Sequence, residues 1–495
     1  MIDHEPLLSV KDVSFRYPAA TGTGGLVLDG VGFRVTAGST TVLMGRADAG
    51  KTTLARVIAG LVPRFTGGGI SGEIRLRGRG IRSVPPYDLV ESVGLVAQDS
   101  EEQLFTTRCD TEVAFALESL GLPRHQIGSR VSESLEKVGL SGFDHRNPAT
   151  LSGGEKKRLL VACLLAVRPD LWILDEALSE LDFDWKARVL EIVSATAGAV
   201  LLMESRWSTL IERRGSAFSL LGRGRVLAAA SSSTDERLAA ALRSAGIRLS
   251  LHSAPVTAAP TGSLQVRGVR FRFPGGAGFA LDVDRLEIGF GEVCALVGRN
   301  GSGKSTLARI LCGLLPPQEG SIAFQGVGGG RPALARELNA RIGYLFQNPD
   351  HQIFLPTVRE ELGLGLRGLH LSRAETDARV SEAARCFDLP DLDFPPALLS
   401  YGARRRLQAA TYFLLSRDLL ILDEVDSGLS YGEIEDLVDR LASRVPGLVL
   451  ITHDLALARS ACHRVLVMER GMIIRDVTAS SLGPGSGAGI WEADL

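Results

Sequence analysis

Short runs of apolar residues, separated by polar or glycine-rich turns, recur along the chain and predict buried strands. Leu171-Trp172-Ile173-Leu174 is a continuous apolar run that ends in Asp175-Glu176. Such runs are typical of parallel strands buried on both faces. The preceding stretch from Gly153 predicts a helix that ends near Arg168, because Pro169 disfavours helix in the residue ahead of it. We therefore expect the acid pair at the carboxyl end of a central strand, where open α/β sheets hold their ligands.

Two further apolar runs lead directly into glycine-rich loops. Strands are predicted at Thr41–Met44 and Val293–Val297, and helices at Thr52–Ala59 and Ser305–Cys312. The pattern then becomes helical between about 100 and 150 and between about 350 and 398, as in TEVAFALESLGLP and TVREELGLGLRGL. We expect each helical stretch to form a small subdomain inserted between the halves of an α/β core.

The same motifs occur twice in the same order. VSFRYP at 13–18 recurs as VRFRFP at 269–274, AQDSEEQLF at 97–105 as FQNPDHQIF at 346–354, and LWILDEALSELD at 171–182 as LLILDEVDSGLS at 419–430. The glycine loops and the LSGGEKKRL stretch at 151–159 recur as well, the latter as LSYGARRRL. Repetition at this period indicates a duplicated domain. The predicted organisation is a first domain at 1–245, a linker at 246–262, a second domain at 263–477 and a flexible tail at 478–495.

Composition and charge narrow the function classes. The 495 residues exceed one ordinary core, and 45% apolar and 23% charged residues are typical of a soluble globular protein. A formal net charge of −2 gives no support for nucleic acid as a direct partner. The six cysteines are widely spaced, which argues for reduced thiols and against a disulfide framework or a metal site. The start, MIDHEPLLSV, lacks the pattern of a signal peptide, and no apolar run is long enough to span a bilayer. We therefore expect membrane contact only through partners.

Both glycine-rich loops have the pattern G-x-x-x-x-G-K-[ST], which we call the first P-loop (45–52) and the second P-loop (298–305). In such loops, backbone N–H groups surround phosphates, the lysine reaches the β- and γ-phosphates and the hydroxyl residue binds Mg²⁺. One match could arise by chance, but two matches, each followed by a strand that ends in Asp-Glu, make chance a poor explanation. The predicted nucleotide-binding residues are Gly45, Gly50, Lys51, Thr52 and Thr53 in the first domain and Gly298, Asn300, Gly301, Gly303, Lys304, Ser305 and Thr306 in the second.

Polar residues at other strand ends are candidates for metal binding and catalysis. Carboxylates and hydroxyls are the hard oxygen ligands that Mg²⁺ prefers. Predicted magnesium ligands are Thr52, Gln98 and Asp175 in the first domain and Ser305, Gln347 and Asp423 in the second. Predicted catalytic residues are Glu176 and Glu424, which would orient and deprotonate water, with Gln347 and His453 near the γ-phosphate. Tyr17 and Phe273 are candidates to stack on adenine, and are equally plausible as packed aromatics of an edge strand.

Taken together, the P-loops, Gln98 and Gln347, the LSGG turn, the Asp-Glu strand ends, the SELD stretch and the ITHD stretch resemble the nucleotide-binding domains of ABC ATPases. The resemblance covers nearly the whole chain twice. It implies two tandem P-loop NTPase domains, each with a RecA-like core, an antiparallel β edge and an inserted helical subdomain. It also implies a second phosphate contact from two signature turns, Ser152-Gly153-Gly154 and Ser400-Tyr401-Gly402.

A narrower resemblance lies in FQNPDHQIF and AQDSEEQLF, which are similar to the ATPase subunits of energy-coupling-factor (ECF) importers, including cobalt-type ones. The first copy lacks the Asn-Pro of that pattern. This resemblance implies ATP and Mg²⁺ as cofactors. It implies a transmembrane scaffold and a substrate-binding membrane subunit as partners, and a cytoplasmic position on the inner face of the membrane. The substrate is not encoded, since membrane subunits choose it.

In this family two domains pair head to tail, so each ATP lies between one P-loop and the other domain's signature turn. Every element of the site built on the second P-loop follows the family pattern. Departures collect in the site built on the first P-loop: Asp48 for a glycine, Ser205 for the histidine, Tyr401 and Ala403 in the signature turn, and Ser430 for the partner aspartate. We therefore expect hydrolysis mainly at the second P-loop, and binding or regulation at the first.

Other readings remain open at this point. A fused sugar-importer ATPase also has tandem domains, although the NPDHQIF stretch counts against it. A soluble ABC ATPase acting on ribosomes would be expected to have a long, charged helical linker, whereas the linker here is short and rich in proline and alanine. DNA-repair relatives need long coiled-coil insertions for which the chain has no room. A nucleotide sensor without hydrolysis is disfavoured by the intact second site.

Overall fold

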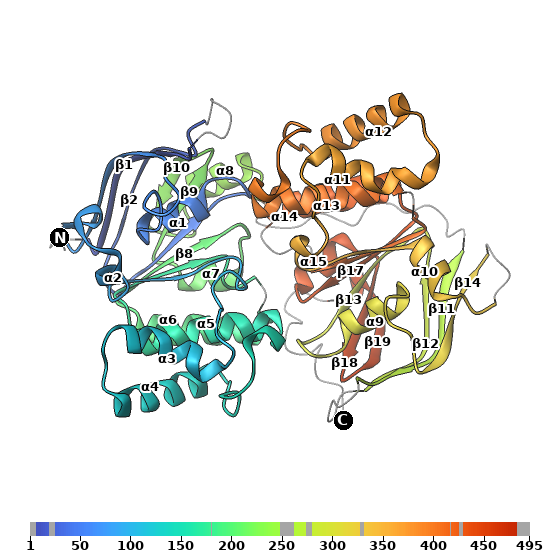
Figure 1. Cartoon of the computed structure of the whole chain (residues 1–495), viewed down its shortest axis with the longest axis horizontal. Coiled ribbons are helices and arrows are strands. Elements are labelled where there is room, and N and C mark those ends of the chain that lie inside the picture. Colours follow the sequence, from blue (N-terminus) through green and yellow to red (C-terminus); the bar gives the residue numbers. More distant parts are fainter. Residues whose placement is uncertain are drawn as a thin grey trace. The chain divides into compact units, whose positions relative to one another are not determined.

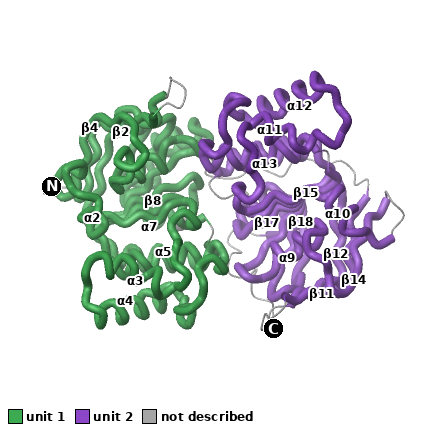
Figure 2. The backbone as a smooth tube through the Cα atoms, viewed as in Figure 1, with its two compact units in different colours: residues 1–249 green, residues 250–495 purple. Residues whose placement is uncertain are grey.

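The apolar runs predicted as strands lie at the centre of two six-stranded sheets, one in each half of the chain. The computed structural model describes residues 6–18, 25–179, 181–247, 262–273, 280–326, 331–415, 417–424 and 429–482. The backbone divides into two units, residues 1–249 and 250–495 (Figure 2). Most of the predicted linker and of the tail lies outside the described residues.

The first unit holds a mainly parallel sheet and a smaller antiparallel sheet (Figure 1). The large sheet has the order β10-β9-β3-β8-β7-β6, with β10 antiparallel to its neighbour. Its strands are β3 (Thr40–Met44), β6 (Val93–Val96), β7 (Leu171–Asp175), β8 (Ala199–Glu204), β9 (Ala217–Gly222) and β10 (Arg225–Ala230). The small sheet has the order β2-β1-β4-β5, from β1 (Leu8–Arg16), β2 (Leu28–Val35), β4 (Gly69–Leu76) and β5 (Arg79–Gly80).

The second unit repeats this topology. Its large sheet has the order β15-β16-β17-β13-β18-β19, which matches the first sheet strand for strand when read from the opposite edge. The strands are β13 (Val293–Val297), β15 (Ile342–Leu345), β16 (Leu419–Asp423), β17 (Gly447–Thr452), β18 (Arg464–Glu469) and β19 (Met472–Thr478). The small antiparallel sheet has the order β12-β11-β14, from β11 (Ser263–Phe271), β12 (Leu281–Gly289) and β14 (Glu319–Gln325).

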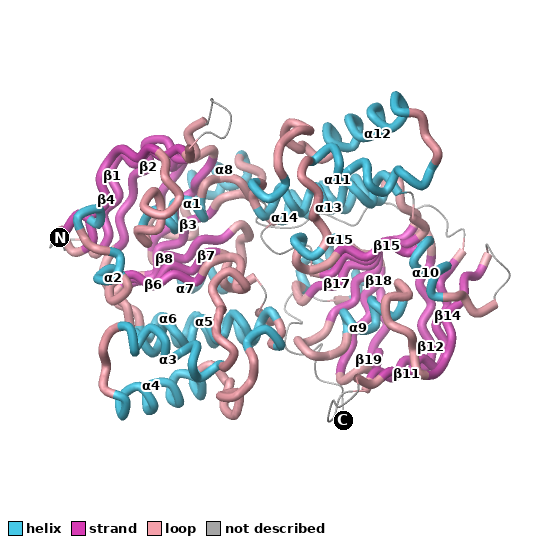
Figure 3. The backbone as a smooth tube through the Cα atoms, viewed as in Figure 1, coloured by secondary structure: helices cyan, strands magenta, loops and turns pink. Residues whose placement is uncertain are grey.

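Helices pack on both faces of each large sheet (Figure 3). In the first unit they are α1 (Lys51–Ile58), α2 (Pro86–Leu89), α3 (Cys109–Ser119), α4 (Arg124–Lys137), α5 (Gly153–Val167), α6 (Phe183–Thr196), α7 (Thr209–Arg214) and α8 (Glu236–Ser244). In the second they are α9 (Lys304–Leu311), α10 (Ala335–Arg341), α11 (Val358–Leu364), α12 (Arg373–Cys386), α13 (Tyr401–Leu415), α14 (Tyr431–Ala442) and α15 (Leu455–Ala461). The helices after the P-loops begin at the lysines, one residue earlier than predicted.

Strand β7 shows how the sequence fixes the core. Successive side chains of a strand point to opposite faces of its sheet. Leu171 and Ile173 accordingly pack into a cluster with α1 and the small sheet, whereas Trp172 and Leu174 pack into a cluster with α3, α4, α5 and α6. A continuous apolar run is therefore needed, because both faces of the strand are buried. The predicted helical subdomains are confirmed as α3 with α4 and α11 with α12.

The parallel strands bring the predicted site residues to one edge in each unit. β3 and β13 end at the P-loops, β7 and β16 end at Asp175 and Asp423, and Ser205 and His453 directly follow β8 and β17. The register places Asp175 opposite Met203 and Asp423 opposite Ile451. The carboxyl edge of each large sheet therefore carries a P-loop, an acid pair and the residue at the position of His453.

Candidate functional site

The second P-loop turns sharply from β13 into α9. Gly301 and Gly303 have φ of +80° and +106°, a left-handed conformation that glycine adopts at little cost. Lys304 is buried and its Nζ donates to the carbonyl oxygens of Gly298 at 2.8 Å and Arg299 at 3.0 Å. The ammonium group is therefore held over the loop, at the amino end of the helix, where an anion is favoured.

The first P-loop keeps this backbone although one glycine is missing. Asp48 occupies the position of Gly301 and has φ of +65°, and Gly50 has φ of +98°. A left-handed aspartate costs roughly 1 kcal/mol relative to glycine, which is tolerable in one turn. Lys51 Nζ donates to Gly45 O at 2.6 Å, as its counterpart does. The departure at Asp48 therefore changes the charge of the loop more than its shape.

In each unit, the hydroxyl and the carboxylate predicted as magnesium ligands lie together. The hydroxyl of Thr52 lies beside Asp175 and that of Ser305 beside Asp423, and each opposes the rise in carboxyl pKa that burial causes. Burial raises the pKa of each aspartate to about 6. The Oδ1 atoms of both are buried and make no hydrogen bond within the described residues. A buried, unpaired carboxylate oxygen beside a hydroxyl fits a hard divalent cation.

The carboxylate of Glu424 in the second unit is surrounded by the other predicted catalytic groups. Gln347 Nε2 donates to Glu424 Oε2 at 2.8 Å, and His453 Nδ1 lies 3.9 Å from Glu424 Oε1. Tyr344, on β15, donates its hydroxyl to the neighbouring Asp423. The second unit therefore joins its acid pair to a glutamine, a histidine and a tyrosine.

The equivalent carboxylate of Glu176 has different neighbours. Lys51 Nζ lies 3.3 Å from Oε1, and Ser205, at the position of His453, donates to Oε2 at 3.2 Å. The Gln98 side chain makes no hydrogen bond within the part of the chain that the structure describes, although Lys157 Nζ donates to its backbone oxygen at 2.5 Å. The first unit thus has an ion pair and a serine where the second has an amide and a histidine.

Sequence reasoning missed a second buried acid beside Glu176. Glu204 ends β8, where the second unit has Thr452, and its carboxyl group lies near that of Glu176. Burial, and then the charge of Glu176, raise the pKa of Glu204 well above its ordinary value, which favours its neutral form. The sequence does show Glu204 as an acid at the end of the apolar run AVLLME, as Asp175 is at the end of LWILD.

The two signature turns open helices of equal length with different caps. Ser152 and Glu155 form a reciprocal capping box at the start of α5. Ala403 replaces the glutamate in the second unit, so only Ser400 Oγ remains as an acceptor, from Ala403 N at 3.2 Å. Tyr401 directs its hydroxyl to Gln347 O at 3.3 Å. Ser430 and Asp182 both accept hydrogen bonds as N-caps of the following helix, so that replacement keeps the cap.

The aromatic residues predicted to stack on adenine lie at the ends of strands β1 and β11. Tyr17 is half-buried, and its hydroxyl lies 3.3 Å from Oγ1 of Thr53, in the first turn of the P-loop helix. Phe273 is partly exposed and meets Phe271 edge to face at 4.9 Å. Tyr17 is therefore tied to its P-loop helix through a hydrogen bond.

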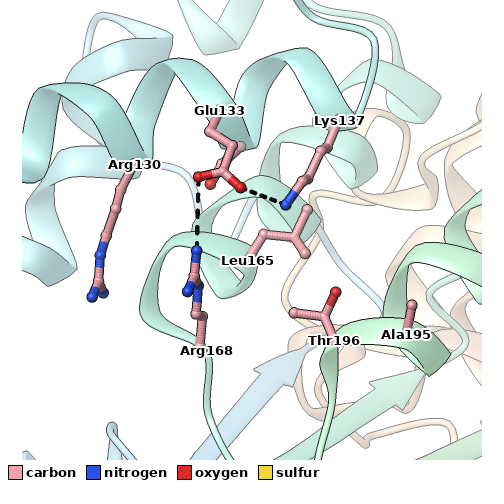
Figure 4. Close-up of a pocket in the computed structure, with 8 residues that line it drawn as sticks. Arg130, Glu133, Lys137, Leu165, Arg168, Ala195 and Thr196 are labelled. Carbon is pink, nitrogen blue, oxygen red and sulfur yellow. Dashed lines mark hydrogen bonds and ion pairs between the residues drawn. The ribbon is translucent and has the colours of Figure 1, made fainter.

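A pocket of about 330 Å³ in the first unit is unrelated to these residues (Figure 4). Glu133 lies between Lys137 at 2.6 Å and Arg168 at 3.7 Å. Arg130 donates to the Ala166 carbonyl near the end of α5. These cations satisfy helix carboxyl ends and one glutamate, as is usual for structural charges. We assign no site to this pocket.

Comparison with known proteins identifies the family to which the chain belongs. The family model described as ABC transporter matches the chain twice, over residues 28–179 and 281–427. A protein of Caldanaerobacter subterraneus subsp. tengcongensis is 32% identical, over 94% of this chain and 91% of its own. One of Methanosarcina mazei is 31% identical, over 97% and 90%. Both are inferred to be ABC transporter ATP-binding proteins.

Solved structures are similar as well. CbiO1 from Clostridium perfringens, part of the ABC transporter complex CbiONQ, is 29% identical over 44% of this chain and 89% of its own, with a TM-score of 0.40. A model of ribosome-bound archaeal Pelota and ABCE1 covers 95% of this chain and 79% of its own at a TM-score of 0.68, and its 19% identity shows a shared fold alone. From the family matches, the chain belongs to the ABC transporter family of ATP-binding proteins, as an ATP hydrolase with two nucleotide-binding domains fused in one polypeptide.

Proposed function

We propose that this ATPase is the energy-coupling subunit of an ECF-type importer for a vitamin or metal ion. Its partners would be a transmembrane scaffold and a substrate-binding membrane subunit. The observation that carries the proposal is the duplicated stretch AQDSEEQLF and FQNPDHQIF, together with the transporter names of relatives that match nearly the whole chain. No helix of the described residues is long and apolar enough to cross a membrane.

The geometry of the duplicated stretch supports a docking role. Gln103 accepts from Ala97 N at 2.7 Å and donates to Leu95 O at 3.0 Å, and Gln352 makes the matching bonds to the 344–346 backbone. These bonds hold each loop after Gln98 or Gln347 in a fixed shape. The final residues, Phe105 and Phe354, are 65% and 69% exposed. A large exposed aromatic on a fixed loop suits contact with a partner protein.

We propose further that hydrolysis occurs mainly at the second P-loop. Glu424 would accept the proton of the attacking water, Gln347 would orient that carboxylate, and His453 would contact the γ-phosphate, with the signature turn Ser152-Gly153-Gly154 closing the site. At the first P-loop, the carboxylate of Glu176 forms an ion pair with Lys51 and lies near the acid Glu204. Loss of one preorganised donor can cost about 3–4 kcal/mol, so this site would bind ATP and turn it over slowly.

Magnesium would be held by Ser305 and Asp423 in the second site and by Thr52 and Asp175 in the first, where unpaired Oδ1 atoms suit it. Bound there, it would neutralise phosphate charge. Tyr344 fixes the other oxygen of Asp423. ATP binding would draw the two domains together and hydrolysis would release them, which moves the loops that carry Phe105 and Phe354.

Affinity purification of the tagged chain from detergent-solubilised membranes of its own organism tests the importer proposal. We expect a polytopic scaffold protein and a small substrate-binding membrane protein to co-purify. Mutation of both Phe105 and Phe354 to serine is expected to reduce that recovery without loss of ATP binding. Co-purification with ribosomes, and none with membrane proteins, would contradict the proposal and favour a soluble ABC ATPase.

A further inference from the structure

We propose that Tyr401 is a positioning residue that links the signature turn of the second domain to the Gln347–Glu424 pair of the same domain. The proposal rests on the proposed function, because it concerns the pair assigned there to hydrolysis. Tyr401 stands where the first signature turn has Gly153, and it is the first residue of α13. A side chain is thus present where the other turn has none.

The Tyr401 hydroxyl lies between two polar groups of its own domain. It accepts from Arg405 Nη2 at 2.8 Å and donates to Gln347 O at 3.3 Å. The guanidinium carbon of Arg405 also lies 5.1 Å from the centre of the Tyr401 ring, a distance at which cation and ring attract. The signature turn and the loop at Gln347 are therefore joined directly.

Arg405 extends this connection to the catalytic carboxylate. Its side chain is 1% exposed, and burying a guanidinium is costly unless it is hydrogen-bonded. Both terminal nitrogens are hydrogen-bonded, whereas Nε makes no hydrogen bond among the described residues. Arg405 donates to Phe346 O at 2.8 Å, to Gln347 O, and to Glu424 O at 3.3 Å. One cation thus fixes the backbone of both Gln347 and Glu424, whose side chains then meet at 2.8 Å.

The first domain shows which of these contacts are common to both domains. Lys157, at the position of Arg405, donates to Ala97 O at 2.7 Å and Gln98 O at 2.5 Å. A buried cation therefore ties the signature helix to the glutamine loop in both domains. The second domain adds the phenol of Tyr401 to this anchor. Its Gln347 side chain is hydrogen-bonded to Glu424, whereas the Gln98 side chain makes no hydrogen bond among the described residues.

Through this connection, Tyr401 would couple the two ATP sites. In the proposed pairing, the second signature turn serves ATP at the first P-loop. A shift of that turn would move the Gln347 carbonyl through Tyr401, and with it the amide that orients Glu424. Misplacement of a catalytic group by about 1 Å can cost 10²-fold in rate. Nucleotide at the first site would thereby set the rate at the second.

The test is a double-mutant cycle of Tyr401→Phe and Gln347→Ala in the full chain, with kcat, KM for ATP and Tm measured for each variant. Tyr401→Phe removes only the hydroxyl. We expect kcat to fall about five- to twentyfold, with KM and Tm unchanged, and the double variant to be no slower than Gln347→Ala alone. A kcat equal to wild type, or losses that multiply, would overturn the role of Tyr401.

A second arm probes the link between the sites. Lys51→Ala, which weakens ATP binding at the first P-loop, is expected to lower kcat in the wild-type background and to have no further effect in Tyr401→Phe. Glu424→Gln is measured alongside. If that variant keeps most of its turnover, the proposed assignment of hydrolysis to the second P-loop fails. If it is inactive while Tyr401→Phe matches wild type, only the role of Tyr401 fails.

Discussion

Gln347 and Glu424 are 77 positions apart in the chain, yet Nε2 of the glutamine donates to Oε2 of the glutamate at 2.8 Å. Each follows a parallel strand, β15 and β16, and these strands are neighbours in the sheet. A carboxylate held by an amide has a fixed direction before substrate arrives, which is how preorganised sites reduce the cost of reaction. In the first domain the equivalent glutamate is held by a lysine and a serine instead.

This difference predicts unequal effects of two matched substitutions. Gln347→Ala is expected to lower the steady-state kcat about 10- to 100-fold, because Glu424 loses the amide that orients it. Gln98→Ala, the control, is expected to change kcat less than twofold, because its side chain has no described hydrogen bond to lose. Equal losses in both variants would contradict the separation of roles.

The buried aspartates predict a stability cost that depends on pH. Burial raises the pKa of Asp423 to about 6 in the folded chain, so the native state binds its proton more tightly than the unfolded state. The contribution of this group to stability is therefore lost as pH rises from about 4 to 6. Asp423→Asn is expected to stabilise the nucleotide-free protein by about 2–3 kcal/mol at pH 8 and to have little effect at pH 4.

Thermal unfolding at the two pH values, without Mg²⁺ or nucleotide, measures this effect. The same substitution is expected to abolish Mg²⁺-dependent ATP hydrolysis at the second site, so stability and activity should move in opposite directions. Asp175→Asn provides a matched variant with the same cause in the first domain. A lower Tm of Asp423→Asn than of the wild type at pH 8 would show that burial of the ionised carboxylate does not destabilise the protein.

The negative charge of Asp48 is expected to weaken ATP binding at the first P-loop. Its backbone already has the left-handed φ of the glycine that it replaces, so the loop needs no rearrangement. Asp48→Asn should therefore tighten ATP binding at this site nearly as much as Asp48→Gly, about fivefold, because both remove a negative charge near phosphates. Equilibrium binding in a Lys304→Ala background measures the first site. If only the glycine variant gains affinity, backbone strain rather than charge limits binding.

The sequence predicted the placement of residues that lie at strand ends. The runs that end at Asp175 and Asp423 had to be buried strands, and G-x-x-x-x-G-K-[ST] had to follow a strand, so Thr52 and Ser305 were expected at the same sheet edge. Their positions beside the aspartates follow from that placement. Counting from Glu424 to His453 also placed Ser205, which does contact Glu176.

The sequence did not predict contacts between side chains of different strands and helices. Tyr344 lies within an apolar strand and Glu204 ends one. The hydrogen bond of Tyr344 to Asp423 and the closeness of Glu204 to Glu176 depend on strand order and side-chain direction. Tyr401 was interpreted as a lost glycine, since its hydrogen bond to the Gln347 carbonyl needs the first turn of α13 to face the glutamine loop. Ser430 was also interpreted as the loss of an aspartate, although it caps α14 as Asp182 caps α6.

The central claim, that one of the two sites performs hydrolysis, is tested most directly by removing each catalytic carboxylate in turn. Steady-state ATPase rates of Glu424→Gln and Glu176→Gln are compared with wild type in the full chain at saturating MgATP. We expect Glu424→Gln to retain less than about 2% of the rate and Glu176→Gln to retain more than half of it. Equal loss in both variants would contradict the account.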